Sequence, residues 1–213
     1  YMADANYRLG NTEEAVRIYK ETLEGGNTGF TELAAARVSH YLYNNERYAE
    51  VIPYYERLET LTSNAEVKFN AQLGIMRSAF LTESWNKSAA YADKVLSKPS
   101  LNSELSQEAY YAKGMGNYYA KNYDAAKTAL VWLIKSTTSA RSAEARFSLA
   151  DIFFQQNHLE DADKEVTGIL KQKPAYNYWI AKGLILRSRI YIKQDKLFES
   201  EQNLKSVLEH YKI

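Results

Sequence analysis

Three histidines are the residues of this sequence best suited to acid–base or metal chemistry. His40, His158 and His210 are far apart along the chain, and none belongs to a His-Glu-x-x-His helix. The sequence has no cysteine, so it offers neither a thiolate nucleophile nor a cysteine metal site. These residues therefore do not form a recognisable constellation for metal-dependent or nucleophilic catalysis.

Two further features could suggest a catalytic or cofactor site. Gly114-Met115-Gly116 has the glycine content of a nucleotide-binding loop, but it lies in a helical run with no strand before it, which favours close helix packing. Asp161 and Asp163 are paired carboxylates near the start of an expected helix, where acids compensate the helix dipole. The sequence predicts a protein that is not an enzyme, with no catalytic residue, no cofactor and no metal ligand.

The elements that position these side chains follow from a pattern that recurs along the whole chain. A lead residue, usually small, is followed four positions later by a bulkier residue and then by an apolar pair. By subtraction, successive lead residues are 36, 37, 38, 36 and 38 positions apart, a period typical of stacked repeats. The lead residues are Ala15, Val51, Ser88, Ala126, Ala162 and Ser200.

Each period contains two runs of apolar residues at helical spacing, separated by a short polar turn. The predicted fold class is all-α: a right-handed α-solenoid superhelix of about six helix-turn-helix repeats. We expect one domain over residues 1–213, with an incomplete first repeat, in a fragment of a longer protein. The predicted helix pairs are 2–9 with 12–24, 29–44 with 47–60, 64–81 with 85–97, 103–120 with 123–135, 140–156 with 159–171, and 176–193 with 197–211.

Capping residues mark where the second helix of each repeat should begin. Their side chains can accept hydrogen bonds from the first-turn amides. Pro53 lies well inside the expected helix 47–60, so that helix either starts late or is kinked there. The predicted caps are Asn11, Asn45, Ser84, Asn122, Asn157 and Asp195.

These residues resemble the tetratricopeptide-repeat family, whose unit is a helix pair with small residues where the backbones meet. The aromatic residue that opens the second helix appears as Tyr48, Trp85 and Tyr123. The resemblance covers the whole chain, although the period exceeds the usual 34 residues. It implies binding of a protein or peptide partner in a concave groove. The matching first-helix positions are Ala3, Ser39, Met76, Gly114, Ala150 and Ser188.

The segments 145–154 and 178–183 also resemble repeats of bacterial cell-envelope assembly proteins. This resemblance implies a scaffold in envelope assembly with a periplasmic or outer-membrane-associated location, and a cytoplasmic location is the alternative. A carbohydrate-binding module of the outer-membrane lipoprotein type is the alternative function, since aromatic rings can stack on sugars.

An aromatic ladder is the first set of candidate groove residues. Twelve positions into each repeat, the first helix carries an aromatic residue in all but the last repeat, which has Ile192. These rings either anchor a bound peptide or fill gaps between neighbouring repeats, and both interpretations stay open. The aromatic members are Tyr7, Tyr43, Phe80, Tyr118 and Phe154.

Residues at adjacent groove positions, all polar or charged except Met115, form the second set. They could orient a charged ligand, or they could be solvated charges on a helix face. The Lys and Asn residues of the family's carboxylate clamp, which holds chaperone tails, are missing from the matching positions. The set consists of Arg37, His40, Arg77, Met115, Asp151 and Arg189.

The overall charge balance limits the partner classes. A formal net charge of +1 creates no long-range field that would recruit nucleic acid or an anionic membrane. No segment approaches the roughly 20 apolar residues of a membrane-spanning helix. The sequence therefore predicts a protein or peptide partner, no nucleic acid and no membrane insertion of this segment, and it leaves the oligomeric state open.

Overall fold

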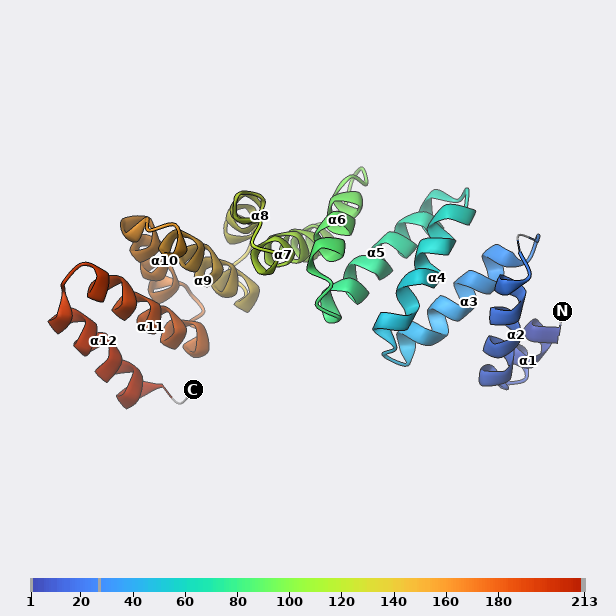
Figure 1. Cartoon of the computed structure of the whole chain (residues 1–213), viewed down its shortest axis with the longest axis horizontal. Coiled ribbons are helices and arrows are strands. Elements are labelled where there is room, and N and C mark those ends of the chain that lie inside the picture. The colour runs from blue at the N-terminus through green and yellow to red at the C-terminus, as the bar shows by residue number, and fades with distance from the viewer. Residues whose placement is uncertain (1, 27, 212–213) are drawn as a thin grey trace. The chain divides into compact units, whose positions relative to one another are not determined.

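The computed structural model describes residues 2–26 and 28–211, which form twelve α-helices and contain no β-strand (Figure 1). Consecutive helices pair as hairpins, so the predicted α-solenoid of helical repeats is confirmed, and the predicted bounds agree within two residues. The helices are α1 (Met2–Arg8), α2 (Thr12–Glu24), α3 (Thr31–Asn44), α4 (Tyr48–Leu61), α5 (Ala65–Leu81), α6 (Trp85–Leu96), α7 (Ser103–Tyr119), α8 (Tyr123–Ser136), α9 (Ala140–Gln155), α10 (Leu159–Lys171), α11 (Asn177–Lys193) and α12 (Leu197–His210).

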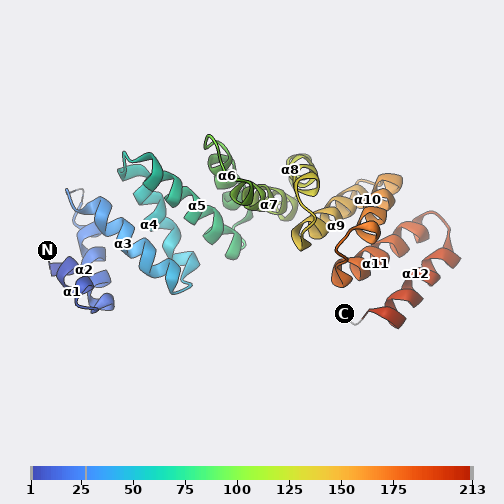
Figure 2. The same cartoon turned by 180° about the vertical axis from the view of Figure 1, so that it is seen from behind.

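The chain divides into two compact units, residues 1–101 and residues 102–213. The N-terminal unit contains α1 to α6, and the C-terminal unit contains α7 to α12 (Figure 2). In each unit the two helices of a repeat pack on each other, and its second helix packs on the first helix of the next repeat of that unit. The expectation of a single domain over residues 1–213 stays a prediction.

The lead residues lie where the two helices of each repeat meet. Ala15, Val51, Ser88, Ala126 and Ala162 are fully buried, and Ser200 is nearly so. Small side chains at these points let the two helices of a repeat approach closely, so the apolar side chains between them are buried from water.

Gly114 allows the closest approach between α7 and α8. A Cβ atom added there would lie 2.7 Å from Leu130 Cδ2 and 3.4 Å from the Leu130 backbone nitrogen. The packing interpretation of Gly114-Met115-Gly116 is therefore the one that fits this structure, because the glycine makes room for Leu130 within a helix.

Each repeat connects its two helices through a turn of three residues with one fixed geometry. The N–H group of the third turn residue donates back to a carbonyl in the last turn of the first helix, as from Arg47 to Leu42 (2.9 Å). This is the bond that closes a helix when the preceding residue has a left-handed backbone. The residues with positive φ in these six turns are Gly10 (84°), Glu46 (58°), Glu83 (56°), Lys121 (62°), Asn157 (61°) and Asp195 (57°).

The same geometry corrects three of the predicted caps. Arg47, His158 and Lys196 precede α4, α10 and α12, so the assignments to Asn45, Asn157 and Asp195 are wrong. The physical reason for Asn157 and Asp195 is that each turn needs one left-handed residue before the cap, and they take that position. Asn and Asp are the side chains that tolerate this conformation best after glycine. Asn45 instead ends α3, where its Nδ2 donates to the Tyr41 carbonyl (2.8 Å).

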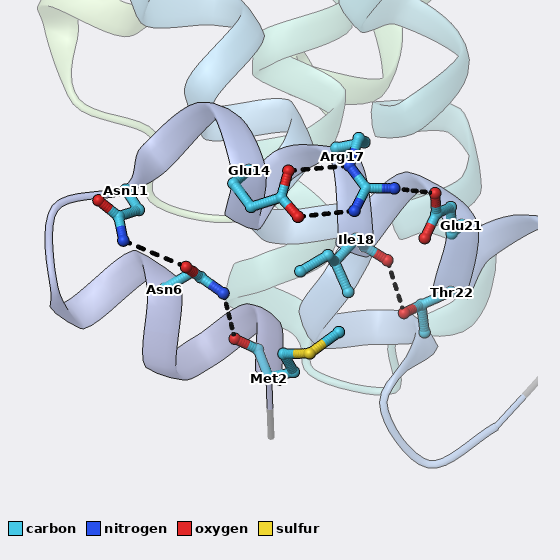
Figure 3. Close-up of polar contacts among 8 residues, drawn as sticks. All are labelled: Met2, Asn6, Asn11, Glu14, Arg17, Ile18, Glu21 and Thr22. Atoms are coloured by element: carbon cyan, nitrogen blue, oxygen red, sulfur yellow. Dashed lines mark hydrogen bonds and ion pairs between the residues drawn. The ribbon is translucent and has the colours of Figure 1, made fainter.

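Asn11 is the residue before α2, as predicted, but its side chain does not cap that helix. Figure 3 shows that Asn11 Nδ2 instead donates to Asn6 Oδ1 (3.3 Å), and Asn6 Nδ2 donates to the Met2 carbonyl (3.1 Å). On the exposed face of α2, Arg17 pairs with both Glu14 and Glu21 (Figure 3). The side chain of Asn11 therefore ties α2 back to α1.

Pro53 lies inside α4, which begins at Tyr48. The alternative in which this helix starts late is therefore wrong. The helix accommodates a residue that has no backbone N–H group to donate.

Candidate functional site

The first helices of the C-terminal unit form one continuous surface. α7 contacts α9 and α9 contacts α11 directly, whereas the second helices α8, α10 and α12 make no comparable contacts with one another within residues 102–211. Helices lie closest together on the inner side of a curved stack. The first helices therefore make the inner face of this unit, where the sequence places the candidate binding residues.

Two tyrosine–carboxylate hydrogen bonds cross from α7 to α9 on this surface. Tyr111 donates to Glu144 Oε2 (2.8 Å) and Tyr118 donates to Asp151 Oδ2 (3.0 Å). The structure thus brings together Tyr118 and Asp151 from the two candidate sets. Tyr111 was missed, although Tyr111 and Glu144 have the same sequence separation as Tyr118 and Asp151, 33 positions.

Burial shifts the titration of these groups. Burial, together with the neighbouring Asp151 carboxylate, raises the pKa of Tyr118 well above its usual value. Burial also raises the pKa of Glu144, against the lowering effects of the Tyr111 hydrogen bond and the Arg141 charge. Burial and the Glu144 hydrogen bond raise the pKa of Tyr111 in the same way, so both tyrosines stay protonated hydrogen-bond donors over the whole physiological range.

Phe154 does not offer an open ring to a ligand. It is only 6% exposed, and the Arg189 guanidinium carbon and Lys193 Nζ lie 4.7 Å and 4.5 Å from its ring centre. The expectation that Phe154 contacts a ligand directly is wrong, because two cations of the next repeat cover it. Arg189 and Lys193 themselves are exposed.

Met115 is also placed differently from the prediction. It is 1% exposed, and its sulfur lies 3.5 Å from Ser148 Oγ of α9. The close contact between α7 and α9 buries this position, so Met115 supports the surface and does not line it.

The candidate residues of the N-terminal unit lie on α1, α3 and α5. The Arg37 guanidinium of α3 stacks over the Tyr7 ring of α1 (4.5 Å), which joins consecutive first helices. The Nε atom of Arg37 is buried and has no hydrogen-bond partner among the described residues. Tyr43 contacts the rings of Tyr48 and Tyr55 edge to face, at 5.4 Å and 6.3 Å between ring centres.

Three further candidates complete this unit. Phe80 is half-buried and packs edge to face on Trp85, with 5.5 Å between the ring centres. Arg77 is half-buried near Tyr55, where burial raises the pKa of Tyr55 to about 12 and Arg77 opposes that rise. His40 is exposed, with Nε2 3.0 Å from Asn44 Nδ2. Of the three, only His40 is exposed.

The described residues also bear on whether the chain has a metal site or a membrane-spanning helix. No group of three or more His, Asp or Glu side chains among them could hold a metal ion. None of the helices in residues 2–26 and 28–211 is both long and apolar enough to cross a membrane.

Comparison with known proteins gives fold relationships only. No family model and no curated protein sequence matches this chain. Among solved structures, YrrB, described as a TPR protein with an unusual peptide-binding site, has a TM-score of 0.63 at 15% identity and covers 90% of this chain and 91% of its own.

Two further structures resemble the chain to a similar degree. A double mutant of MamA RS-1 has a TM-score of 0.65 at 15% identity, covering 86% of this chain and 96% of its own. PilW, described as a widely conserved type IV pilus biogenesis factor, has a TM-score of 0.56 at 16% identity, covering 99% and 90%. At these identities the likeness establishes the architecture.

Proposed function

We propose that this chain, which has the tetratricopeptide-repeat fold, is a non-enzymatic scaffold that binds a peptide or protein partner on the surface of its first helices. The observation that carries the proposal is that α9 contacts both α7 and α11. Hydrogen bonds between α7 and α9 already fix side chains on this surface. A surface ordered before binding loses less side-chain entropy on association.

Several contacts provide this order in both units. Tyr118 is held by Asp151, Arg189 lies on Phe154, and Arg37 lies on Tyr7. The aromatic ladder therefore mainly fixes the polar side chains of the neighbouring repeat. The proposed contacts with a partner are the accessible groups of that surface, which include His40 in the N-terminal unit and Arg189 in the C-terminal unit.

The finer part of the proposal is a role in bacterial envelope assembly with a periplasmic or outer-membrane-associated location. The resemblance of segments 145–154 and 178–183 to envelope repeats supports it, and so does the fold likeness to a pilus biogenesis factor. Protease treatment of intact spheroplasts of the native cells tests it. Degradation there supports an envelope location, and full protection supports the cytoplasmic alternative.

Selection of peptides from a random display library against the whole chain tests the binding function. Two matched variants locate the surface: Ile192→Ser on α11, where Ile192 is 52% exposed, and Val131→Ser on α8, where Val131 is 37% exposed. Both remove an exposed β-branched side chain, one from a first helix and one from a second helix. We expect the selected peptides to lose about tenfold in affinity for Ile192→Ser, about 1.4 kcal/mol, and less than about twofold for Val131→Ser.

Two results would count against this assignment. If no peptide is selected, the scaffold proposal fails for peptides, and binding of the same protein on a glycan array would then favour the carbohydrate alternative. If both variants lose affinity equally, the binding surface does not lie on the first helices. Unfolding curves of both variants confirm that they are folded.

A further inference from the structure

Helix α11 has an unusual charge composition. It contains Lys182, Arg187, Arg189 and Lys193 and no Asp or Glu. Because an α-helix turns by about 100° per residue, residues 7 and 11 positions apart return to nearly the same direction. Lys182, Arg189 and Lys193 therefore share one face of α11, and we call these three residues the α11 basic stripe.

The cations of the α11 basic stripe lie against aromatic rings and have no carboxylate partner. Lys182 Nζ is 5.6 Å from the ring centre of Tyr178 and 6.0 Å from that of Phe147. Arg189 and Lys193 share the ring of Phe154. No ion pair joins any of the three to an acid in residues 2–26 and 28–211.

Arg187 shows what a compensated cation looks like on the same helix. Its Nε and Nη2 atoms donate to the two carboxylate oxygens of Asp163 at 2.6 Å and 3.1 Å. This pair faces α10, on a different side of α11 from the basic stripe. The helix therefore neutralises the cation that faces its neighbour and leaves uncompensated the three that share the other face.

The acids of the neighbouring first helix do not supply the missing charge. Glu144 and Asp151 of α9 stand 38 positions before Lys182 and Arg189, at equivalent places in the preceding repeat. Their carboxylates accept hydrogen bonds from tyrosines of α7 and form no ion pair with the cations of the α11 basic stripe. The α11 basic stripe thus remains a local excess of positive charge on the inner face of the unit.

We infer that the α11 basic stripe binds an acidic peptide segment of a partner protein, an inference that rests on the proposed scaffold function and names its ligand class. A cation held against a ring has already lost part of its mobility and hydration, so pairing with a carboxylate costs less. Arg189 also presents the planar fork that binds a carboxylate through two parallel hydrogen bonds.

The size of the stripe favours a peptide over other anionic partners. Residues 182–193 span about 16 Å along the helix axis, which about five residues of extended peptide cover. Three cations are few for nucleic-acid binding, since a typical DNA-binding protein makes about 6–10 phosphate contacts. Anionic membrane recognition likewise uses clusters of about 4–8 basic residues. Tyr178 and Ile192, each 52% exposed, add apolar contact area beside the charges.

Fluorescence anisotropy with a labelled twelve-residue peptide of alternating Glu and Gly tests the inference, and the same peptide with Gln in place of Glu is its neutral control. The whole chain is compared with the double variant Arg189→Gln/Lys193→Gln. The matched control Lys164→Gln/Lys171→Gln removes two exposed cations from α10 of the same unit. We expect at least about tenfold weaker binding of the Glu peptide for the α11 variant and less than about twofold for the α10 variant.

A conservative variant separates charge from packing. Arg189→Lys keeps the cation but loses the fork, so it should bind the Glu peptide with an affinity between those of the whole chain and the double variant. Equal loss of affinity in the α10 and α11 variants would overturn the inference, because it would mean diffuse attraction. Tighter binding of a twelve-nucleotide single-stranded RNA than of the Glu peptide would also overturn it.

The outcomes distinguish this inference from the scaffold proposal. If display-selected peptides bind and depend on Ile192 but the Glu peptide does not bind, the scaffold proposal stands and the acidic ligand is wrong. If neither the selected peptides nor the Glu peptide binds, both proposals fail.

Discussion

The two units join successive repeats through different faces. In the N-terminal unit, the second helices are linked by ion pairs between lysines and glutamates: Lys20 with Glu50 (2.7 Å), Lys87 with Glu56 (2.7 Å) and Lys94 with Glu59 (2.8 Å). In the C-terminal unit, the first helices are linked through direct packing and through the bonds from Tyr111 to Glu144 and from Tyr118 to Asp151.

This difference indicates which face of each unit is held most firmly. The pairs of Lys20 with Glu50 and of Lys87 with Glu56 are partly exposed, and exposed ion pairs contribute a median of about 0–1 kcal/mol, because solvent screens them and two long side chains must be ordered. Glu59 is buried, but it lies on the second helix α4 and not on the first-helix surface. Hydrogen bonds to half-buried carboxylates contribute more, about 1.5–3 kcal/mol. We therefore expect the first-helix surface to be more rigid in the C-terminal unit, where the proposed acidic ligand binds.

The largest expected effect comes from removing the C-terminal bridges. Tyr111→Phe combined with Tyr118→Phe should lower the free energy of unfolding by about 3 kcal/mol or more, since Glu144 and Asp151 each lose a tyrosine donor. Tyr91→Phe in the N-terminal unit should cost less than about 1 kcal/mol, because Glu59 keeps Lys94 and Gln72 as donors. Denaturant unfolding measures the sizes, and native-state hydrogen exchange assigns them to helices. Equal losses would remove the distinction between the units.

Acidification should have a smaller effect on the free energy of unfolding, and the effect should have opposite signs for Glu59 of the N-terminal unit and Glu144 of the C-terminal unit. Burial raises the pKa of Glu59, but hydrogen bonds from Lys94, Gln72 and Tyr91 outweigh it and hold the pKa below its usual value. The stabilisation from Glu59 is therefore present above the unfolded-state pKa and lost as the pH falls through the folded-state pKa. For Glu144 the pKa is raised by burial, so its contribution is present at low pH and lost as the pH rises through the folded-state pKa.

The free energies of unfolding of the unchanged protein and of the variants Glu59→Gln and Glu144→Gln, measured between about pH 3 and about pH 7, test these two pH dependences. Relative to Glu59→Gln, the unchanged protein should lose stability toward acid. Relative to Glu144→Gln, it should lose stability toward neutral pH. The same slope for both comparisons would contradict the assigned environments.

The turns should respond alike in both units, because their geometry is shared. Glu83 in the N-terminal unit and Lys121 in the C-terminal unit both have a left-handed backbone, at φ 56° and 62°. Glycine at either position relieves that strain but costs more chain entropy, so each substitution should stabilise by about 0.5–1 kcal/mol. Gly10→Ala, the reverse change at φ 84°, should destabilise by a similar amount. Thermal unfolding of the three variants tests this, and a loss of stability in Glu83→Gly or Lys121→Gly would contradict it.

Salt should have the smallest effect and should act mainly on the N-terminal unit. Raising the NaCl concentration from about 0.05 M to about 0.5 M should weaken the Lys–Glu pairs by a few tenths of a kcal/mol in total. Hydrogen exchange should therefore quicken slightly in α4 and α6 and stay constant in α7. A larger response in α7 than in α4 would mean that ion pairs matter more in the C-terminal unit.

The fold was largely predictable from the sequence because the same residue pattern recurs in every repeat. Six lead residues with nearly constant spacing define the same helix pair six times, so an ambiguous boundary in one repeat is resolved by the others. The left-handed turn residues were not predictable in this way. Glu83 and Lys121 have no side-chain preference for positive φ, and only the geometry of the turn imposes it.

The candidate site was only partly predictable, because the sequence places residues on a helix but does not say what covers them. Phe154 was assigned correctly to the first-helix ladder, yet the long side chains of Arg189 and Lys193 close over it. Met115 occupies the same repeat position as Asp151 and is buried between α7 and α9. Side-chain length in the next repeat decides exposure, and periodicity does not contain that information.

The three-residue turns have a consequence for how such a chain can change in length. Every hairpin closes with the same number of residues, whereas the connectors between repeats vary: 62–64 has three residues, 172–176 has five and 97–102 has six. An epitope tag of several residues inserted into 172–176 should therefore leave every hairpin intact. The same tag inserted into 45–47 would separate the Arg47 amide from the Leu42 carbonyl, break the hydrogen bond that closes the turn and destabilise the hairpin of α3 and α4.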